Sequence, residues 1–97
     1  MIITRHGSDC IKIQFADTIL AFNPPSKDSK KQSVRFGADV VFSSIKHPDF
    51  YGVDTIPAKG ENIFVIDGPG EYEVKGVFVR GFSSKSFYDM GKYLNTI

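Results

Sequence analysis

Residues that could do chemistry gather in one short stretch, "SSIKHPDFYG", which covers residues 43–52. His47 and Asp49 stand two positions apart there, soon after the apolar run 38–42. Loops that leave a buried strand are held still by the scaffold beneath them, so they often carry functional groups. An imidazole and a carboxylate in this position are compatible with three structures: a metal site, the remnant of one, or a polar turn in which Asp49 accepts backbone hydrogen bonds.

A hydrolytic zinc site needs at least three protein ligands and one open coordination position. Besides His47 and Asp49, the chain offers the imidazole of His6 and the thiol of Cys10. In an extended strand His6 and Cys10 would share a face but lie roughly 13 Å apart, at ~3.3 Å per residue. They could share one ion only if the chain between them folds sharply. The residue types alone therefore favour the polar turn over metal binding.

Nucleophilic catalysis is disfavoured by the same spacing. A triad of Ser43 or Ser44 with His47 and Asp49 would come from one loop, whereas the three groups of a triad normally come from separate elements that line them up. Cys10 stands beside alternating apolar residues, a setting typical of a cysteine in the core. The sequence therefore predicts no catalytic nucleophile.

Two other segments could suggest phosphate binding. Residues 67–71, "DGPGE", contain Pro69, which lacks an N–H, and an extended acidic segment follows instead of a helix, so this motif predicts a turn. The basic cluster in residues 27–35 has no interleaved aromatic rings for base stacking. With 12 basic and 11 acidic residues the net charge is only +1, so we expect no nucleic-acid partner.

The elements that must position these groups are strands. The 97 residues allow one domain, and 41% hydrophobic residues indicate a globular chain. Alternating or continuous apolar patterns predict about six strands, at residues 2–4, 10–15, 18–22, 40–43, 62–67 and 71–82. A bulge or tight bend is expected at Gly76, where the alternation changes parity. Residues 83–94 show a rough helical spacing that Gly91 weakens, so little helix is expected.

Cysteine content and hydropathy bear on the compartment. The single cysteine, Cys10, excludes an internal disulfide and favours a reducing environment. The apolar stretch in residues 1–5 is too short for a signal peptide, and no run approaches transmembrane length. We therefore expect a cytoplasmic protein that does not associate with membranes.

Three stretches, in this order, resemble the N-terminal half of a metallo-β-lactamase superfamily domain, most closely its branch of predicted metal-dependent hydrolases. Residues 1–25 are similar to the opening meander, and residues 38–52 to the strand that enters the His-x-His-x-Asp-His metal loop. Residues 63–82, "IFVIDGPGEYEVKGVFVRGF", closely resemble the "GPGEYEV-x-G-V" segment of that branch. The resemblance implies an α+β, mostly β chain that forms half of an αββα sandwich, with residues 1–97 as one truncated domain.

The departures from the family pattern fall on its metal ligands. Ile45 stands where the resemblance places the first histidine of the metal loop, and Phe50 stands where it places the last. Ser8 replaces a histidine that is frequent in the first turn, and Asn23 replaces an aspartate before proline. The remaining family ligands belong to the second half of the domain. Since Ile and Phe cannot coordinate a cation, the loop resembles the remnant of a two-metal site.

The resemblance and its departures together predict a non-catalytic, shortened relative of these hydrolases that serves as a binding or assembly module and needs no cofactor. Half a sandwich would expose an apolar face and open strand edges, so we expect a homo-oligomer. The alternative is a residual hydrolase in which His47 and Asp49, the two residues that match the motif, bind one zinc or manganese ion with help from His6 or another chain. A truncated reading frame without a cellular role is a third possibility.

Overall fold

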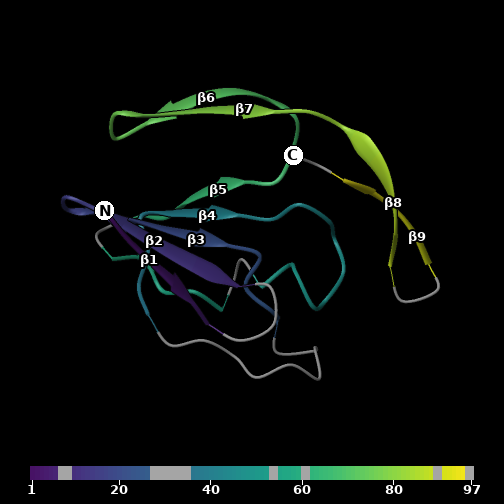
Figure 1. Cartoon of the computed structure of the whole chain (residues 1–97), viewed down its shortest axis with the longest axis horizontal. Helices are drawn as coiled ribbons and strands as arrows, with labels where there is room; N and C mark the ends of the chain where they lie inside the picture. Colours follow the sequence, from purple (N-terminus) through teal and green to yellow (C-terminus); the bar gives the residue numbers. More distant parts are fainter. Residues whose placement is uncertain (7–9, 27–35, 53–54, 60–61, 89–90, 96–97) are drawn as a thin grey trace.

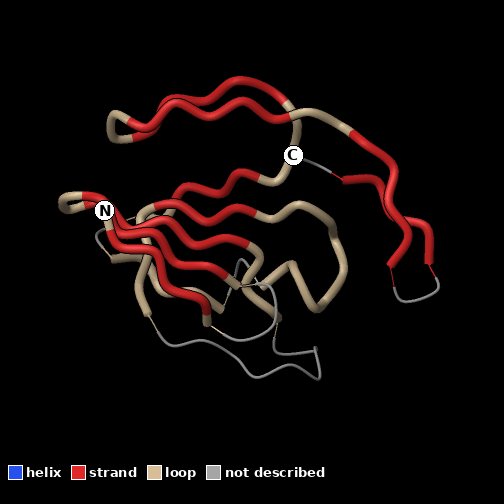
Figure 2. The backbone as a smooth tube through the Cα atoms, viewed as in Figure 1, coloured by secondary structure: helices blue, strands red, loops and turns tan. Residues whose placement is uncertain are grey.

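A computed structural model describes residues 1–6, 10–26, 36–52, 55–59, 62–88 and 91–95. Strands are the only regular elements in this described part, which confirms the mostly β prediction (Figure 2). Their bounds are β1 Ile2–Arg5, β2 Ile11–Phe15, β3 Thr18–Phe22, β4 Val40–Phe42, β5 Phe64–Ile66, β6 Gly70–Val74, β7 Val77–Gly81, β8 Ser84–Tyr88 and β9 Gly91–Asn95. No helix in the described part of the chain is long and apolar enough to cross a membrane.

The main sheet has five strands in the order β1-β2-β3-β4-β5. The first three form the predicted antiparallel meander, with Ile13 of β2 opposite Ile3 on one side and Leu20 on the other. Strands β3, β4 and β5 then run parallel, so that Leu20 lies opposite Val40 and Val40 lies opposite Phe64. The sheet is therefore mixed, and all of its parallel pairs are on one side of β3.

The segment predicted as one strand over residues 71–82 forms two, β6 and β7, which pair as a tight antiparallel hairpin. Val74 and Val77 face each other across a two-residue turn, Lys75-Gly76. Both turn residues have positive φ, 50° and 80°, as such hairpin turns require. The tight bend predicted at Gly76 is confirmed, and it explains the change of parity there.

The β6–β7 hairpin covers one face of the main sheet (Figure 1). Its inward side chains pack against a buried cluster in β3, β4 and β5 that consists of Leu20, Val40, Phe42 and Ile66. The opposite face of the sheet has a second cluster, formed by Ala21, Ala38, Val41 and Ile56. Strand β4 is thus buried on both faces, which explains its continuous apolar sequence.

The helical spacing in residues 83–94 is misleading, because this segment forms an antiparallel hairpin of β8 and β9. This hairpin lies to one side of the main sheet, beyond the end of β7 (Figure 1). Together with the division of residues 71–82, it gives nine strands in the described residues instead of about six. The basic cluster at 27–35 and Ser8 lie outside the described residues. The overall arrangement is consistent with one half of an αββα sandwich.

Candidate functional site

The carboxyl ends of β3, β4 and β5 lie at one edge of the sheet, because these strands are parallel. Asn23 follows β3, Ser43 follows β4 and Asp67 follows β5. Open sheets with parallel strands bind ligands at this edge, where the loops leave the rigid scaffold. We call it the carboxyl edge, and it also carries the loop that contains His47 and Asp49.

Asn23 connects the ends of β3 and β4. Its side-chain Oδ1 accepts hydrogen bonds from the backbone N of Ser44 at 2.8 Å and from the Ser44 hydroxyl at 3.0 Å. Its own backbone N–H donates to the carbonyl of Phe42 at 2.7 Å. Asn23 also adopts a left-handed φ of 52°, which asparagine tolerates better than most residues. The side-chain oxygen of Asn23 is therefore occupied by hydrogen bonds that hold the end of β3 to the residues after β4.

Ser43 is fully buried, and its polar groups are used by the surrounding backbone. Its N–H donates to the carbonyl of Ile66 at 3.0 Å. Its hydroxyl oxygen lies 2.9 Å from the carbonyl oxygen of Phe50 and 3.1 Å from that of Ile45. This hydroxyl therefore holds the loop after β4 in a closed shape, a structural role.

His47 and Asp49 are brought together in a turn within this loop. The backbone N–H of Asp49 donates to Nδ1 of His47 at 3.0 Å, and a carboxylate oxygen of Asp49 lies 3.8 Å from the same nitrogen. The carbonyl of His47 accepts the N–H of Phe50 at 2.8 Å, which closes the turn. The imidazole is buried, with 8% of its side chain exposed.

The hydrogen bond to Nδ1 sets the tautomer of His47. A neutral imidazole has one donor and one acceptor nitrogen, so an accepting Nδ1 leaves the ring proton on Nε2. A cation bound at Nε2 would require that proton to move to Nδ1, where it would face the N–H of Asp49. A cation bound at Nδ1 would have to displace the same N–H. Either way, metal binding by His47 would cost the hydrogen bond that the Asp49 N–H donates to its ring.

Two of the departures from the family pattern, Ile45 and Phe50, lie in this loop and are buried to different extents. Ile45 is 2% exposed and belongs to the largest fully buried side chains of the described residues. The ring of Phe50 is half-buried, with its centroid 6.5 Å from that of His47. Apolar packing therefore occupies positions where the resemblance expects ligands.

His6 lies at the same end of the sheet, because β1 is parallel to β3. The chain does fold sharply after β1, since the N–H of His6 donates to the carbonyl of Cys10 at 2.8 Å. The ring of His6 packs against Phe36 at 4.9 Å, and within the described residues its buried Nε2 has no hydrogen-bond partner. His6 is thus held by aromatic packing.

Cys10 is completely buried, and burial raises the pKa of its thiol from 9.0 to about 11. We expect alkylation by iodoacetamide at pH 8 to be about a hundredfold slower in the native protein than in urea, because the thiolate is the reactive form. Mass spectrometry of timed samples measures both rates. Native and unfolded rates within threefold of each other would contradict the buried, inert thiol.

The donor set in the described residues does not fit a hydrolytic cation. No group of three or more His, Cys, Asp or Glu residues that could hold a metal occurs in that part of the chain. His47 and Asp49 meet, but His6 does not complete such a group with them. Since hydrolytic zinc needs three protein ligands, the described part of the loop and its neighbours provide too few.

Sequence reasoning missed a second polar contact at the carboxyl edge. The hydroxyl of Tyr51 donates to a carboxylate oxygen of Asp67 at 2.6 Å, and the ammonium of Lys46 lies 5.8 Å from the centroid of the Tyr51 ring. This contact joins the loop after β4 to the end of β5. The only sequence signal is that Asp67 follows an apolar strand.

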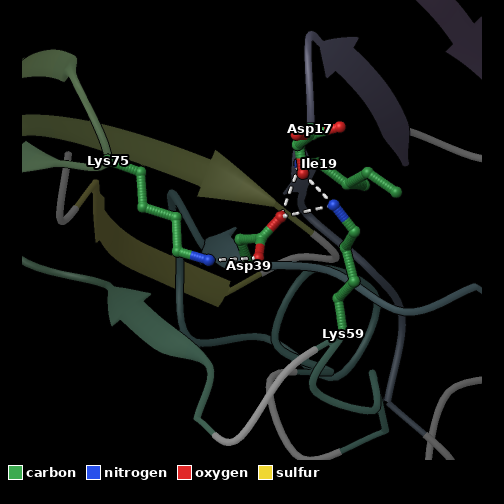
Figure 3. Close-up of polar contacts among 5 residues, drawn as sticks. All are labelled: Asp17, Ile19, Asp39, Lys59 and Lys75. Carbon is green, nitrogen blue, oxygen red and sulfur yellow. Dashed lines mark hydrogen bonds and ion pairs between the residues drawn. The ribbon is translucent and has the colours of Figure 1, made fainter.

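Sequence reasoning also missed a buried carboxylate, that of Asp39 (Figure 3). Asp39 immediately precedes β4, so it lies at the amino ends of the parallel strands. Asp39 accepts the N–H of Ile19 at 2.8 Å and pairs with Lys75 at 2.7 Å and Lys59 at 3.7 Å. Lys59 also donates to the backbone carbonyl of Asp17. Burial by itself would raise the pKa of Asp39, but the hydrogen bonds from Lys75 and Ile19 and the two ammonium charges outweigh it, so the pKa is lowered. We call this group the Asp39 cluster.

Comparison with known proteins agrees with the resemblance noted in the sequence. A family model described as the beta-lactamase superfamily domain matches residues 2–96, nearly the whole chain. No curated protein and no solved structure gives a significant match. The fold, with its strand meander, parallel strands and covering hairpin, is consistent with this family match. The chain therefore belongs to the β-lactamase superfamily.

Proposed function

We propose that this chain is a non-catalytic member of its superfamily that acts as an assembly module and works as a homo-oligomer. The observation that carries this proposal is the closed turn at the former metal loop. His47 uses its Nδ1 lone pair to accept the N–H of Asp49, and Ile45 is buried at a position where the family pattern has a histidine. These groups of the loop are thus used to hold its own conformation.

The energetics of the turn support loss of catalysis. A metal-activated water needs a cation held by several lone pairs in a fixed geometry, with one position left open. In this loop a cation would gain one imidazole and one carboxylate at the expense of the hydrogen bond from the Asp49 N–H to Nδ1 of His47. An ion held by only two protein ligands is bound weakly, so we expect no resident metal.

Exposed apolar side chains support the assembly role. Ile2 and Ile3 on the edge strand β1 are 60% and 65% exposed, and Phe78 and Phe82 on the hairpin are 69% and 71% exposed. Large exposed apolar patches on a small domain commonly mark protein interfaces. Strand β1 also stands at one end of the strand order of the main sheet, a position to which a further strand or chain can be added.

Metal analysis tests the loss of catalysis. The untagged protein is incubated with excess zinc or manganese, passed through a desalting column and analysed by plasma mass spectrometry. We expect fewer than about 0.1 ions per chain, because two ligands do not retain a divalent cation through that step. About one ion per chain that is lost in the variant His47→Ala would contradict the proposal and favour a residual hydrolase with a single-ion site.

A further inference from the structure

We propose that two copies of this chain associate through the outward side of the β6–β7 hairpin, an inference that rests on the proposed assembly function and names its interface. This surface, the outer hairpin face, consists of side chains that point away from the main sheet. Its members are Pro69, Glu71, Glu73, Phe78, Arg80 and Phe82.

Alternation along the hairpin separates this face from the core. Tyr72, Val74, Val77 and Val79 point inward and pack on the buried cluster of the main sheet. The intervening residues point outward, where Phe78 and Phe82 are among the most exposed apolar side chains of the described residues. Phe78 in β7 and Phe82, the first residue after β7, are 69% and 71% exposed and form an apolar stripe on the described part of the chain.

Charges of opposite sign lie beside this stripe. Strand β6 contributes Glu71 and Glu73, and strand β7 contributes Arg80 between the two rings. Glu71 and Arg80 are partners in the register, and the Arg80 Nε lies 3.4 Å from a carboxylate oxygen of Glu71. Both side chains are about two-thirds exposed, so each can form a further contact outside the chain.

A two-fold axis parallel to the strands makes this face complementary to itself. The axis places β6 of one copy over β7 of the other at the same height, so that Arg80 meets the partner's Glu71 and Glu71 meets the partner's Arg80. Beyond the last pair of the register, Gly70 with Gly81, the exposed Pro69 and Phe82 lie at the same end of the hairpin. The same register places Glu73 over the partner's Phe78. A two-fold interface repeats every contact, so four charges pair across the axis, those of Arg80 and Glu71 from each copy, while each Glu73 lies beside a phenyl ring.

Other arrangements of the same two faces are less favourable. A two-fold axis across the strands would place β6 over β6 and bring Glu71 against the partner's Glu71, which like-charge repulsion disfavours. A partner surface with only positive or only negative charges would be complementary to β6 or to β7, but not to both strands. The charge pattern thus identifies a second copy as the occupant and fixes its orientation.

A charge-swap experiment tests this interface. In sedimentation velocity at about 100 μM protein, a concentration suited to a small interface, we expect the wild type to form dimers. The variants Arg80→Glu and Glu71→Arg should each weaken dimerisation by at least about tenfold, because each places like charges across the axis. An equimolar mixture of the two variants should form heterodimers with an affinity within about threefold of the wild type.

The mixture distinguishes contacts between chains from contacts within a chain. In each variant residues 71 and 80 of the same chain carry like charges, so heterodimers can be stabilised only by pairs between the two chains. Thermal unfolding of each variant checks its fold, and the control variant Lys46→Glu, a charge reversal on the carboxyl edge, should leave dimerisation unchanged. A monomeric wild type would overturn both this interface and the homo-oligomer. A wild-type dimer that Arg80→Glu leaves intact and Ile3→Lys disrupts would overturn this interface alone, in favour of pairing at β1. Metal analysis tests the loss of catalysis separately.

Discussion

Replacing Gly52 with alanine is expected to prevent the chain from folding stably. A Cβ at this position would lie 2.2 Å from the carbonyl oxygen of Pro25, 2.5 Å from its carbonyl carbon and 2.8 Å from the carbonyl oxygen of Pro24. These are backbone atoms, so no side-chain rotation can relieve the clash. We expect the free energy of unfolding to fall by more than about 4 kcal/mol, which is much of the total stability of a small domain.

The close approach at Gly52 has a structural reason. The N–H of Gly52 donates to the carbonyl of Pro24 at 2.6 Å, and the hydroxyl of Thr55 donates to the carbonyl of Gly52 at 2.7 Å. Nearby, the N–H of Ser26 donates to the carbonyl of Pro48 at 2.7 Å. The loop after β4 is therefore packed, backbone against backbone, on the segment after β3, and it keeps its shape only while that contact is tight.

Urea unfolding followed by far-ultraviolet circular dichroism measures this effect. The matched control is Gly68→Ala, because the nearest atom to a Cβ there is the Tyr72 hydroxyl at 3.8 Å, an ordinary contact. We expect the control to change stability by less than about 0.5 kcal/mol. If Gly52→Ala unfolds at the same urea concentration as Gly68→Ala, the close packing of the two loops is wrong.

Replacing Asp39 with asparagine is expected to lower the free energy of unfolding by about 2–3 kcal/mol at pH 7. Breaking a buried ion pair costs about 3–5 kcal/mol when a buried charge loses its partner. The cost is smaller for the Asp39 cluster, because Lys59 and Lys75 are 37% and 54% exposed and can return to water. The side-chain oxygen of asparagine can still accept the N–H of Ile19. The decrease in the free energy of unfolding therefore measures the two ionic contacts with Lys59 and Lys75.

The effect of Asp39→Asn should depend on pH in a defined direction. The folded protein lowers the pKa of Asp39, so its contribution to stability is present above the unfolded value of about 3.8 and is lost as the pH falls through the folded pKa. We therefore expect the difference between wild type and variant to be full at pH 7 and to shrink below about pH 3.8.

Urea unfolding at pH 7, 5 and 3 measures this difference. Asp17→Asn is the control, because Asp17 contributes only its backbone carbonyl to the cluster. The control should remain close to the wild type at every pH. A wild-type advantage over Asp39→Asn that stays constant down to pH 3 would argue against an ionised Asp39 as its source.

The elements that the sequence predicted correctly are those with a strong local pattern. The apolar run at 40–42 reflects burial on both faces of a sheet. Alternation over residues 10–15 identifies β2, although Ile11 and Phe15 are 38% and 53% exposed. Both patterns are properties of a segment by itself. The segment 83–94 was predicted poorly because a few apolar residues can match a helix and a strand equally well.

The details of the candidate site depend on contacts between distant residues. Asp39 stands in an otherwise apolar segment, but its partners Lys59 and Lys75 are identified only once the loops are placed. In the same way, the sequence shows that Ile45 cannot bind a cation. That Nδ1 of His47 accepts a backbone N–H follows from the dihedral angles of the turn, which the residue types alone do not determine.

The mixed order of the main sheet has a consequence for the speed of folding. Strands β1, β2 and β3 join through short connections, and so do β6 and β7, so these units can form within microseconds of collapse. Strand β4 has to find β3 across a connection of many residues, and β5 then has to find β4 across another. Because closing these two loops costs entropy, we expect the docking of β4 to be the slow step, and before it the hairpin lacks the complete surface on which it packs.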